Sequence, residues 1–333
     1  MMDWSNLTFQ YYDVNAHVEY IWQNGAWDQG KLVEKAEITI HVGAQCLHYG
    51  QAAFEGLKAY RGKDGKIRIF RLDENAKRLA SSANRTMMAE VSEELFKEAV
   101  IKAVEANEEF VPPYGTGGSL YIRPLLIGSG PMLAVAPANE YRLLVVVTPV
   151  GTYYKDGVKA VDACVVEGYD RAAPGGVGHV KVAGNYAASL LPAKEARDKG
   201  FPINIYLDSK EHSFIDEFGT SNFIAIKGNT YITPDSPSIL PSITNKTLIT
   251  LAEDQGMKVE RRPVRLDEIE DFEQIAACGT AVIVTPIHKI VTAEKTYTVG
   301  DGSLHPKLEE LYKTILAIQY GEIEDKFNWN TVL

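Results

Sequence analysis

The sequence is poor in cysteine and has no long apolar run. Only three cysteines occur among 333 residues, Cys46, Cys164 and Cys278, and they form neither a CxxC pair nor a metal-ligand spacing. A disulfide framework is therefore not expected, and a reducing compartment is favoured. No segment contains the ~18 consecutive apolar residues of a membrane span, so no membrane helix is expected.

Basic residues are also outnumbered, because 34 Lys and Arg stand against 44 Asp and Glu, which gives a formal net charge of −10. Nucleic acid is not expected as a partner, since its phosphate backbone requires a basic surface. The first six residues lack the basic and apolar parts of a secretion signal, which predicts a cytoplasmic protein. The histidines His41, His48 and His179 have no ligand spacing, so no metal site is expected.

The segments that are present indicate a mixed α/β (α+β) protein of two domains. We expect helices over residues 73–88, 92–109, 184–199, 248–255 and 304–320, with Asp73 and Ser92 as the caps of the first two. Asn24-Gly25 and Asp64-Gly65 predict two hairpins, the first after the strand-like run 17–22 and the second over 57–70. Other strands are expected at 118–126, 140–149, 160–166, 202–207, 213–216, 222–226, 230–233, 257–264 and 280–284. The predicted division is a small N-terminal domain (1–150), a linker (151–157) and a larger C-terminal domain (158–333).

A single lysine, Lys181, lies in a glycine-rich stretch, residues 174–186 (PGGVGHVKVAGNY). A lysine in this setting either binds a phosphate or acts as a nucleophile once its pKa is lowered. A solvated lysine in a glycine-rich loop is the alternative interpretation. Tyr186, at the end of the stretch, is a candidate donor to the oxygen of an aromatic cofactor.

Glu217 is embedded between apolar residues in FIDEFGTSN (214–222). A buried carboxylate needs a partner, either a protonated heteroaromatic nitrogen or a structural ion pair. Residues 240–245 (LPSITN) lead into a helix whose first N–H groups can bind an anion, or which Ser242 or Thr244 simply caps. Thr280, in CGTA, can offer its hydroxyl to a phosphate or belong to an ordinary turn.

Two arginines and two aromatic residues complete the candidates. Arg78, on the first helix, can bind a phosphate or be solvated. Arg123 lies within a β-prone run, where a charge needs either a substrate carboxylate or an internal acid. Tyr49 and Phe54, in HYGQAAFEG (48–56), can line an apolar pocket or belong to the core.

Together these segments resemble the branched-chain amino acid aminotransferases of the fold-type IV (class IV) pyridoxal phosphate family. The likeness runs through nearly the whole chain and rests on ordered matches at similar spacings. The matching segments are HYGQAAFEGLKAY (48–60), SLYIRP (119–124), KVAGNY (181–186), EFGTSN (217–222), LP (240–241) and GTA (279–281).

The resemblance implies a two-domain fold-type IV architecture, a pyridoxal 5′-phosphate cofactor and a role for each candidate. Lys181 is the implied catalytic residue, bonded to the cofactor and then carrying protons, and Glu217 is the implied partner of the pyridine nitrogen. Tyr186 is expected at the phenolic oxygen. The expected phosphate ligands are Arg78, the N–H groups of Ile243 and Thr244, and Thr280. The expected substrate residues are Tyr49, Phe54, Tyr121, Tyr153 and Arg123, with backbone groups of Thr220 and Ala281.

The implied reaction moves the amino group of L-leucine, L-isoleucine or L-valine to 2-oxoglutarate, in a homodimer. Family members from vertebrates carry a CxxC pair after the GTA segment, but Val282 and Thr285 occupy those positions here, so a thiol switch is not expected. The alternatives within the family are D-amino acid aminotransferase and aminodeoxychorismate lyase. A non-catalytic pyridoxal phosphate-binding protein is the alternative from another class.

Overall fold

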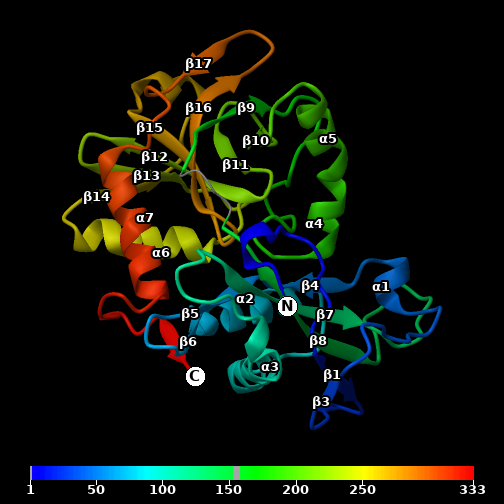
Figure 1. Ribbon diagram of the computed structural model, residues 1–333. Coiled ribbons are helices and arrows are strands. Elements are labelled where there is room, and N and C mark those ends of the chain that lie inside the picture. The colour runs from blue at the N-terminus through cyan, green and yellow to red at the C-terminus, as the bar shows by residue number, and fades with distance from the viewer. Residues whose placement is uncertain (1, 153–157) are drawn as a thin grey trace. The chain divides into compact units, whose positions relative to one another are not determined.

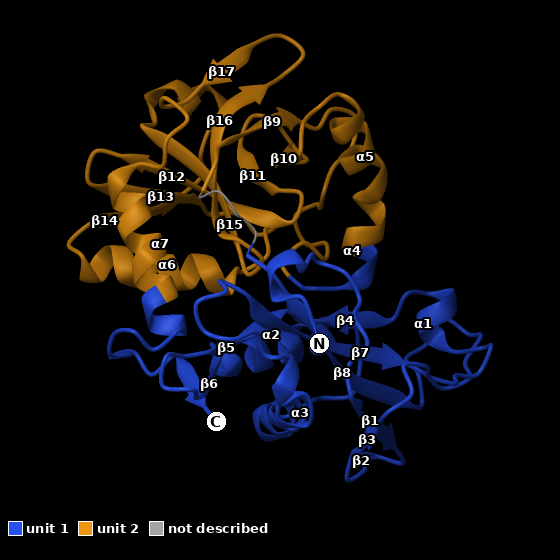
Figure 2. Ribbon diagram, in the orientation of Figure 1, with its two compact units in different colours: residues 1–152, 180–184, 317–333 blue, residues 153–179, 185–316 orange. Residues whose placement is uncertain are grey.

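Two compact units make up the chain in the computed structural model, which describes residues 2–152 and 158–333. Unit 1 contains residues 1–152, 180–184 and 317–333, and unit 2 contains residues 153–179 and 185–316 (Figure 2). Two short segments from the second half of the chain thus belong to unit 1, which a single boundary cannot describe. The domain boundary at 150 and the linker at 151–157 stay predictions, since residues 153–157 lie outside the described ranges.

Unit 1 is built on an antiparallel sheet with the strand order β18-β6-β5-β7-β8-β1-β2, in which β3 also pairs with β1 and β4 with β7 (Figure 1). The two hairpins and the long strand pair expected from the sequence are confirmed. The strands are β1 (His17–Gln23), β2 (Ala26–Trp27), β3 (Lys31–Val33), β4 (Ala52–Phe54), β5 (Leu57–Arg61), β6 (Ile67–Phe70), β7 (Ser119–Gly128), β8 (Tyr141–Val150) and β18 (Asn330–Val332).

The helices of unit 1 are the short α1 (Gln45–His48), α2 (Leu72–Arg85) and α3 (Glu93–Ala106). Ser92 caps α3 as expected, because its hydroxyl accepts a hydrogen bond from the N–H of Leu95 at 3.1 Å. Asp73 is not the cap of α2, since the helix follows Arg71, whose φ is +55°. Asp73 lies instead in the first turn, where its charge favours the helix N-terminus.

Strand β7 presents different residues to the two faces of the sheet. Leu120, Ile122 and Leu126 point to one side and are fully buried, and α3 contacts β1, β7 and β8. Tyr121 and Arg123 alternate with these residues and therefore point to the opposite side. The alternation in SLYIRPLLIG thus places an apolar core on one face and two candidate substrate residues on the other.

Unit 2 contains a ring of six strands, because β11-β10-β9-β16-β15-β12 are hydrogen-bonded in this order and β12 pairs again with β11. β13 and β14 extend the sheet from β12, and β17 pairs with β16. The strands are β9 (Val161–Val165), β10 (Ile203–Leu207), β11 (Ile215–Phe218), β12 (Ser221–Lys227), β13 (Thr230–Pro234), β14 (Lys258–Arg262), β15 (Gln274–Gly279), β16 (Ile283–Val291) and β17 (Thr296–Thr298). Its core includes Ile205, Phe218, Phe223, Ile275 and Ile287.

The remaining helices are α4 (Ala183–Ala188), α5 (Leu190–Asp198), α6 (Ile243–Asp254) and α7 (Pro306–Gln319). The single helix expected over 184–199 is wrong, since it breaks at Ser189. Pro192 has no N–H to donate to the carbonyl of Ala188, so one continuous helix cannot form. Within the described ranges, no helix combines the length and the apolar character of a membrane span.

Candidate active site

The backbone of Lys181 is fixed within unit 1. Residues 180–184 run beside β4, where Val182 forms an antiparallel bridge with Ala53. The N–H of Phe54 donates to the carbonyl oxygen of Lys181 at 3.1 Å, and the N–H of Lys181 donates to the hydroxyl of Ser82 on α2 at 3.0 Å. Three contacts from two elements therefore set the position of the lysine main chain.

The Lys181 side chain lies over the ring of Phe54, a predicted substrate residue that Arg123 also contacts. Its Nζ is 4.7 Å from the centroid of the Phe54 ring, and the guanidinium carbon of Arg123 is also 4.7 Å from that centroid. Arg123 donates to the hydroxyl oxygen of Tyr121 through Nε at 3.2 Å and through a terminal nitrogen at 2.8 Å. Gly56 permits this arrangement, since a Cβ there would lie 2.3 Å from the Tyr121 hydroxyl.

Two residues beside Tyr121 were not predicted. Phe9 packs edge-on against the Tyr121 ring, with centroids 4.9 Å apart, and nothing in the composition of the N-terminal segment indicates this contact. Lys58 is the cross-strand neighbour of Tyr121 in β5, and burial lowers its pKa to about 8. A charged residue within a β-prone run is the signal that identified Arg123. The same signal could have identified Lys58.

Arg78 has a buried counter-ion that the sequence did not reveal. Its Nε and one terminal nitrogen each lie 2.8 Å from a carboxylate oxygen of Glu55, and the Glu55 side chain is completely buried. The pair links α2 to the residue between β4 and β5. Because a guanidinium presents its donors in a rigid plane, this pairing orients the group.

Glu217, on β11 of unit 2, is buried, accepts two hydrogen bonds and forms an ion pair. One oxygen lies 2.7 Å from a guanidinium nitrogen of Arg171 and accepts from the N–H of Leu240 at 2.9 Å, and the other accepts from Asn222 at 2.9 Å. Burial raises the pKa of Glu217 to about 7, while the charge of Arg171 and the two hydrogen bonds act to lower it. The acid is therefore rigidly held and balanced between its two protonation states near neutral pH.

The start of α6 lies beside this acid, since Leu240 bonds to Glu217. Ser242 is the N-cap and accepts a hydrogen bond from the N–H of Asn245 at 3.2 Å. Ile243 and Thr244, the first two residues of α6, are buried, and no group among the described residues accepts their N–H groups. N–H groups at a helix start have no acceptor within the helix, and an anion can supply one.

The turns that carry Thr220 and Thr280 lie at the same end of unit 2. Asn222 pairs with Cys278 in the antiparallel β12 and β15, so the turn before Asn222 and the turn after Cys278 are neighbours. A Cβ on Gly279 would lie 3.9 Å from the carbonyl oxygen of Thr220. Residues 280–282 form the turn that brings Thr280 and Ala281 to Thr220. The strand expected at 280–284 therefore begins too early, and β15 was not predicted, because its small residues Ala276 and Ala277 carry little β propensity.

Backbone strain marks the end of this turn. Ile283 has a φ of +62°, which is rare for a β-branched residue. Gly279 pairs with Ile283 across the turn. The backbone that presents Thr280 and Ala281 is thus held in a conformation that the surrounding sheet must impose.

Three predicted residues remain. Tyr186 is half-buried on α4, and Tyr153 lies outside the described residues. Tyr49 is 51% exposed, and its hydroxyl donates to the carbonyl oxygen of Leu133 at 2.7 Å. Tyr49 thus belongs to a surface lobe that also carries α1, and its place in a substrate pocket stays a prediction.

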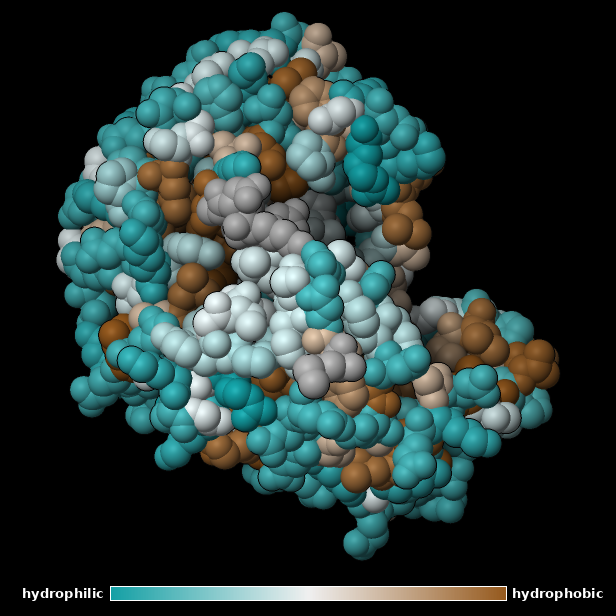
Figure 3. All heavy atoms as spheres, viewed as in Figure 1, coloured by the Kyte–Doolittle hydropathy of each residue, from teal (hydrophilic) through white to brown (hydrophobic). Residues whose placement is uncertain are grey.

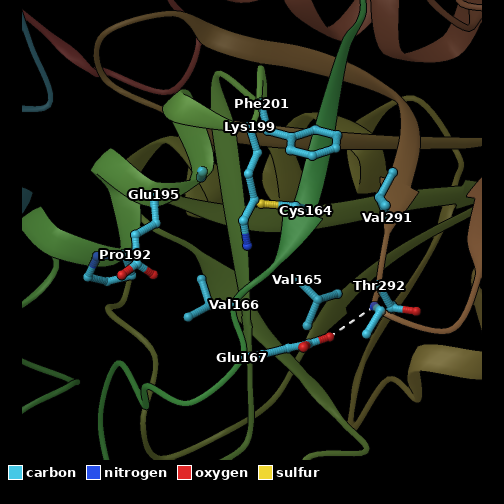
Figure 4. A pocket seen from close by; sticks show the side chains of 12 residues that line it. Cys164, Val165, Val166, Glu167, Pro192, Glu195, Lys199, Phe201, Val291 and Thr292 are labelled. Carbon is cyan, nitrogen blue, oxygen red and sulfur yellow. Dashed lines mark hydrogen bonds between the residues drawn. The ribbon is translucent and has the colours of Figure 1, made fainter.

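A cavity of about 240 Å³ lies in unit 2, under one face of α5 (Figure 4). It is lined by segments 164–167, 192–201 and 291–293, with the Cys164 thiol and the Lys199 amine among its polar groups. None of the predicted site residues lines it. Burial raises the pKa of the Cys164 thiol, which makes this cysteine a poor nucleophile.

Comparisons with known proteins identify the family. The sequence model of the amino-transferase class IV family matches residues 52–290. A branched-chain-amino-acid aminotransferase of Helicobacter pylori is 46% identical over 98% of this chain and 97% of its own length, and one of Haemophilus influenzae is 43% identical over 98% of both. The chain therefore belongs to the class IV aminotransferases.

Solved structures agree with this assignment. The branched-chain amino acid aminotransferase of Thermobaculum terrenum, in its pyridoxal phosphate form, matches with a TM-score of 0.78 and 26% identity, over 94% of this chain and 97% of that chain. The branched-chain amino acid aminotransferase of Escherichia coli matches with a TM-score of 0.78 and 28% identity, over 93% of this chain and 98% of that chain. The fold-type IV architecture expected from the sequence is confirmed.

Proposed function

We propose that this chain is a pyridoxal 5′-phosphate-dependent branched-chain-amino-acid aminotransferase. It transfers the amino group of L-leucine, L-isoleucine or L-valine to 2-oxoglutarate, which becomes L-glutamate. The observation that carries this conclusion is the identity of 43–46% along nearly the whole length of two enzymes of that name. The placement of Lys181 beside Phe54 and Arg123 supports it, because a reactive amine, an apolar ring and a cation are what such substrates need.

The residues present fit the cofactor in two respects. The N–H groups of the buried residues Ile243 and Thr244 have no acceptor within α6, and a phosphate group can supply one. The buried carboxylate of Glu217 can accept a hydrogen bond from a protonated pyridine nitrogen, which gives it a further cationic partner. When bound, pyridoxal phosphate supplies an aldehyde for the amino group and a ring that withdraws electrons from Cα.

The cofactor ligands have separate tasks in this proposal. The phosphate would be bound, and the ring's position thereby fixed, by three groups: Arg78, the first N–H groups of α6 and the Thr280 hydroxyl. Tyr186 donates to the phenolic oxygen. Glu217, kept ionised, holds the proton on the pyridine nitrogen.

Lys181 acts as both anchor and proton carrier. Its Nζ would hold the cofactor through the aldehyde carbon, and the substrate amine would take its place there. As a free amine, Lys181 would take the proton from the substrate Cα and deliver it to that carbon, which is general base followed by general acid catalysis. The fixed main chain of Lys181 leaves only the side chain to move between these positions.

The substrate residues must accept leucine and glutamate in turn. The apolar side chain is proposed to contact four aromatic residues, Phe54, Tyr121, Tyr49 and Tyr153. The α-carboxylate is proposed to bind to backbone groups of Thr220 and Ala281. Arg123 is proposed to bind the distal carboxylate of glutamate. Its stacking on Phe54 keeps the guanidinium against an apolar surface, so one pocket can serve both side chains.

A panel of half-reactions tests the proposed function. The cofactor-loaded enzyme is mixed with L-Leu, L-Ile, L-Val, L-Glu or D-Ala, and the visible absorbance of the bound cofactor is followed. The four L-amino acids are expected to remove this absorbance, and each half-reaction should proceed without a second substrate, as in ping-pong kinetics. A response to D-Ala alone would instead support a D-amino acid aminotransferase.

We also propose that the enzyme is a homodimer. The apolar lobe of unit 1 consists of residues 42–49 and 131–136, which are joined by hydrogen bonds of Met132, Tyr49 and Gln45. Figure 3 shows brown, apolar residues gathered over this lobe, beside α1. Its exposed side chains include Val42 (78%), Leu47 (59%), Leu133 (69%) and Val135 (87%). An exposed apolar surface of this kind is typical of a contact between copies, which covers the same surface on both.

Replacing Val135 with glutamate is expected to convert the dimer into a monomer, because the charge would be buried in the contact. Sedimentation velocity measures the change. Val332→Glu, at a 49% exposed valine outside the lobe, is the matched control and should remain dimeric. A monomeric wild-type protein, or a dimeric Val135→Glu variant, would contradict the proposal.

A cytoplasmic location is proposed as well. All three cysteines are free thiols, and Cys278 is completely buried. Unpaired cysteines are typical of proteins that work in a reducing compartment.

A further inference from the structure

Arg171 contacts the candidate catalytic machinery at two points in unit 2. Its guanidinium lies 2.7 Å from a carboxylate oxygen of Glu217 and donates to the carbonyl oxygen of Ser238 at 2.9 Å. The side chains of Arg171 and Glu217 are only 7% and 3% exposed, so solvent screens their attraction little. Two partners and deep burial give the arginine one fixed orientation.

The Glu217 carboxylate depends on this cation for its charge. Asp216, its neighbour on β11, acts to raise the pKa of Glu217, and so does burial. Cys278 faces the acid from β15, and burial together with Glu217 raises the pKa of its thiol, so it stays neutral. Among the groups that face Glu217 within the described ranges, Arg171 is the one that carries a positive charge.

Arg171 also joins two loops. The carbonyl of Ser238, which it binds, lies two residues before Leu240, whose N–H binds Glu217. Gly178, seven residues after Arg171, packs so closely on Ser238 that a Cβ would clash with its carbonyl oxygen. The segment that leads to Lys181 is thus held against the turn that leads to α6.

We propose that Arg171 is a positioning residue of the transamination reaction, which keeps Glu217 ionised and aimed at the pyridine nitrogen. This inference rests on the proposed function. A carboxylate that took up a proton could no longer hold the proton on the pyridine nitrogen, and the ring would withdraw electrons from Cα less strongly. Arg171 therefore acts on the cofactor through Glu217 without touching the reacting atoms.

The test compares Arg171→Met and Arg171→Lys with the wild type. Arg265→Met is the matched control, because Arg265 is half-exposed and pairs with Asp267 at the surface of the same unit. Two quantities are measured between pH 6 and pH 9: the rate of the half-reaction with L-Leu, and the midpoint of the pH titration of the bound cofactor's absorbance. Thermal unfolding and cofactor content verify that each variant is folded and loaded.

Arg171→Met is expected to slow the half-reaction about 10- to 100-fold at pH 7, the usual loss when a group that orients a direct ligand is removed. The acid limb of its pH profile should move to higher pH by about one unit or more, because loss of the cation raises the pKa of Glu217. Arg171→Lys keeps the charge and should recover part of this shift. Arg265→Met should match the wild type.

Unshifted pH profiles and titration midpoints in both Arg171 variants would overturn the inference, even if their rates fell. If Arg171→Met does not fold, Arg171→Gln takes its place in the same two measurements. The cofactor titration needs no turnover, so it tests Arg171 even if the wild-type enzyme fails to react with L-Leu. That failure would count against the proposed function alone.

Discussion

Replacing Lys181 with alanine is expected to lower the rate of transamination by at least about 10⁴-fold. The variant loses the amine that bonds to the cofactor and the group that moves the substrate proton, and proton transfer by a positioned side chain is worth about 10²–10⁴-fold by itself. The fold should survive, because the hydrogen bonds of Lys181 with Phe54 and Ser82 are made by its main chain. Steady-state assays with L-Leu and 2-oxoglutarate measure the loss.

Borohydride reduction provides an independent readout of the same residue. The reduced wild-type protein should retain its cofactor after denaturation, and a digest should locate it on the peptide that contains Lys181. Lys194→Ala is a suitable control, since Lys194 is 66% exposed and pairs with Asp198 at the surface. Near-normal activity in Lys181→Ala, or cofactor fixed on another lysine, would refute the assignment.

Replacing Glu217 with glutamine is expected to cost about 10²–10³-fold in kcat, comparable to removing one preorganised electrostatic group from an active site. Glutamine has nearly the same shape, and its carbonyl oxygen can still accept from Leu240, so the change removes the charge together with the hydrogen bond from Asn222. Without a carboxylate, the proton on the pyridine nitrogen would not be held, and the ring would withdraw electrons from Cα less strongly. Stopped-flow half-reactions with L-Leu measure the effect on chemistry directly.

The pH profile of the Glu217 variant carries a second expectation. In the wild type, activity should decline as the pH falls through the pKa of Glu217, which burial raises to about 7 and a bound pyridinium lowers again. Glu217→Gln has no such group, so this acid limb should disappear. Glu211→Gln, at a 51% exposed side chain in the same unit, should keep both rate and profile. An unchanged acid limb in Glu217→Gln would assign the titration to another group.

Local sequence signals predicted the elements that local chemistry determines. Ser92 caps α3 through its own hydroxyl, and the alternation in SLYIRPLLIG gives β7 its two faces. The prediction failed at β15, where distant neighbours decide: β15 is a strand because β12 and β16 flank it, although its alanines favour no strand. It also failed between α4 and α5, where the local signal of Pro192 divides a helix that periodicity alone would continue.

The same distinction holds for the site. Lys181, Glu217 and Arg123 stood out because each is a charge in an apolar or glycine-rich context. The counter-ions Glu55 and Arg171 did not stand out. Glu55, for example, lies 23 positions from Arg78, and no local pattern links Glu55 to Arg78. Pairing between buried charges depends on three-dimensional contact, which one sequence does not contain.

The hydrogen bond between Lys181 and Ser82 joins residues 99 positions apart, and this has a consequence for folding. A contact of such long range closes a large loop, which is entropically costly and slow. On the ribosome, residues 1–152 can build most of their sheet before the lysine segment emerges, but unit 1 still lacks residues 317–333 until these have been synthesised. We therefore expect the nascent chain to acquire its reactive amine late, so that incomplete chains are poor at capturing the cofactor.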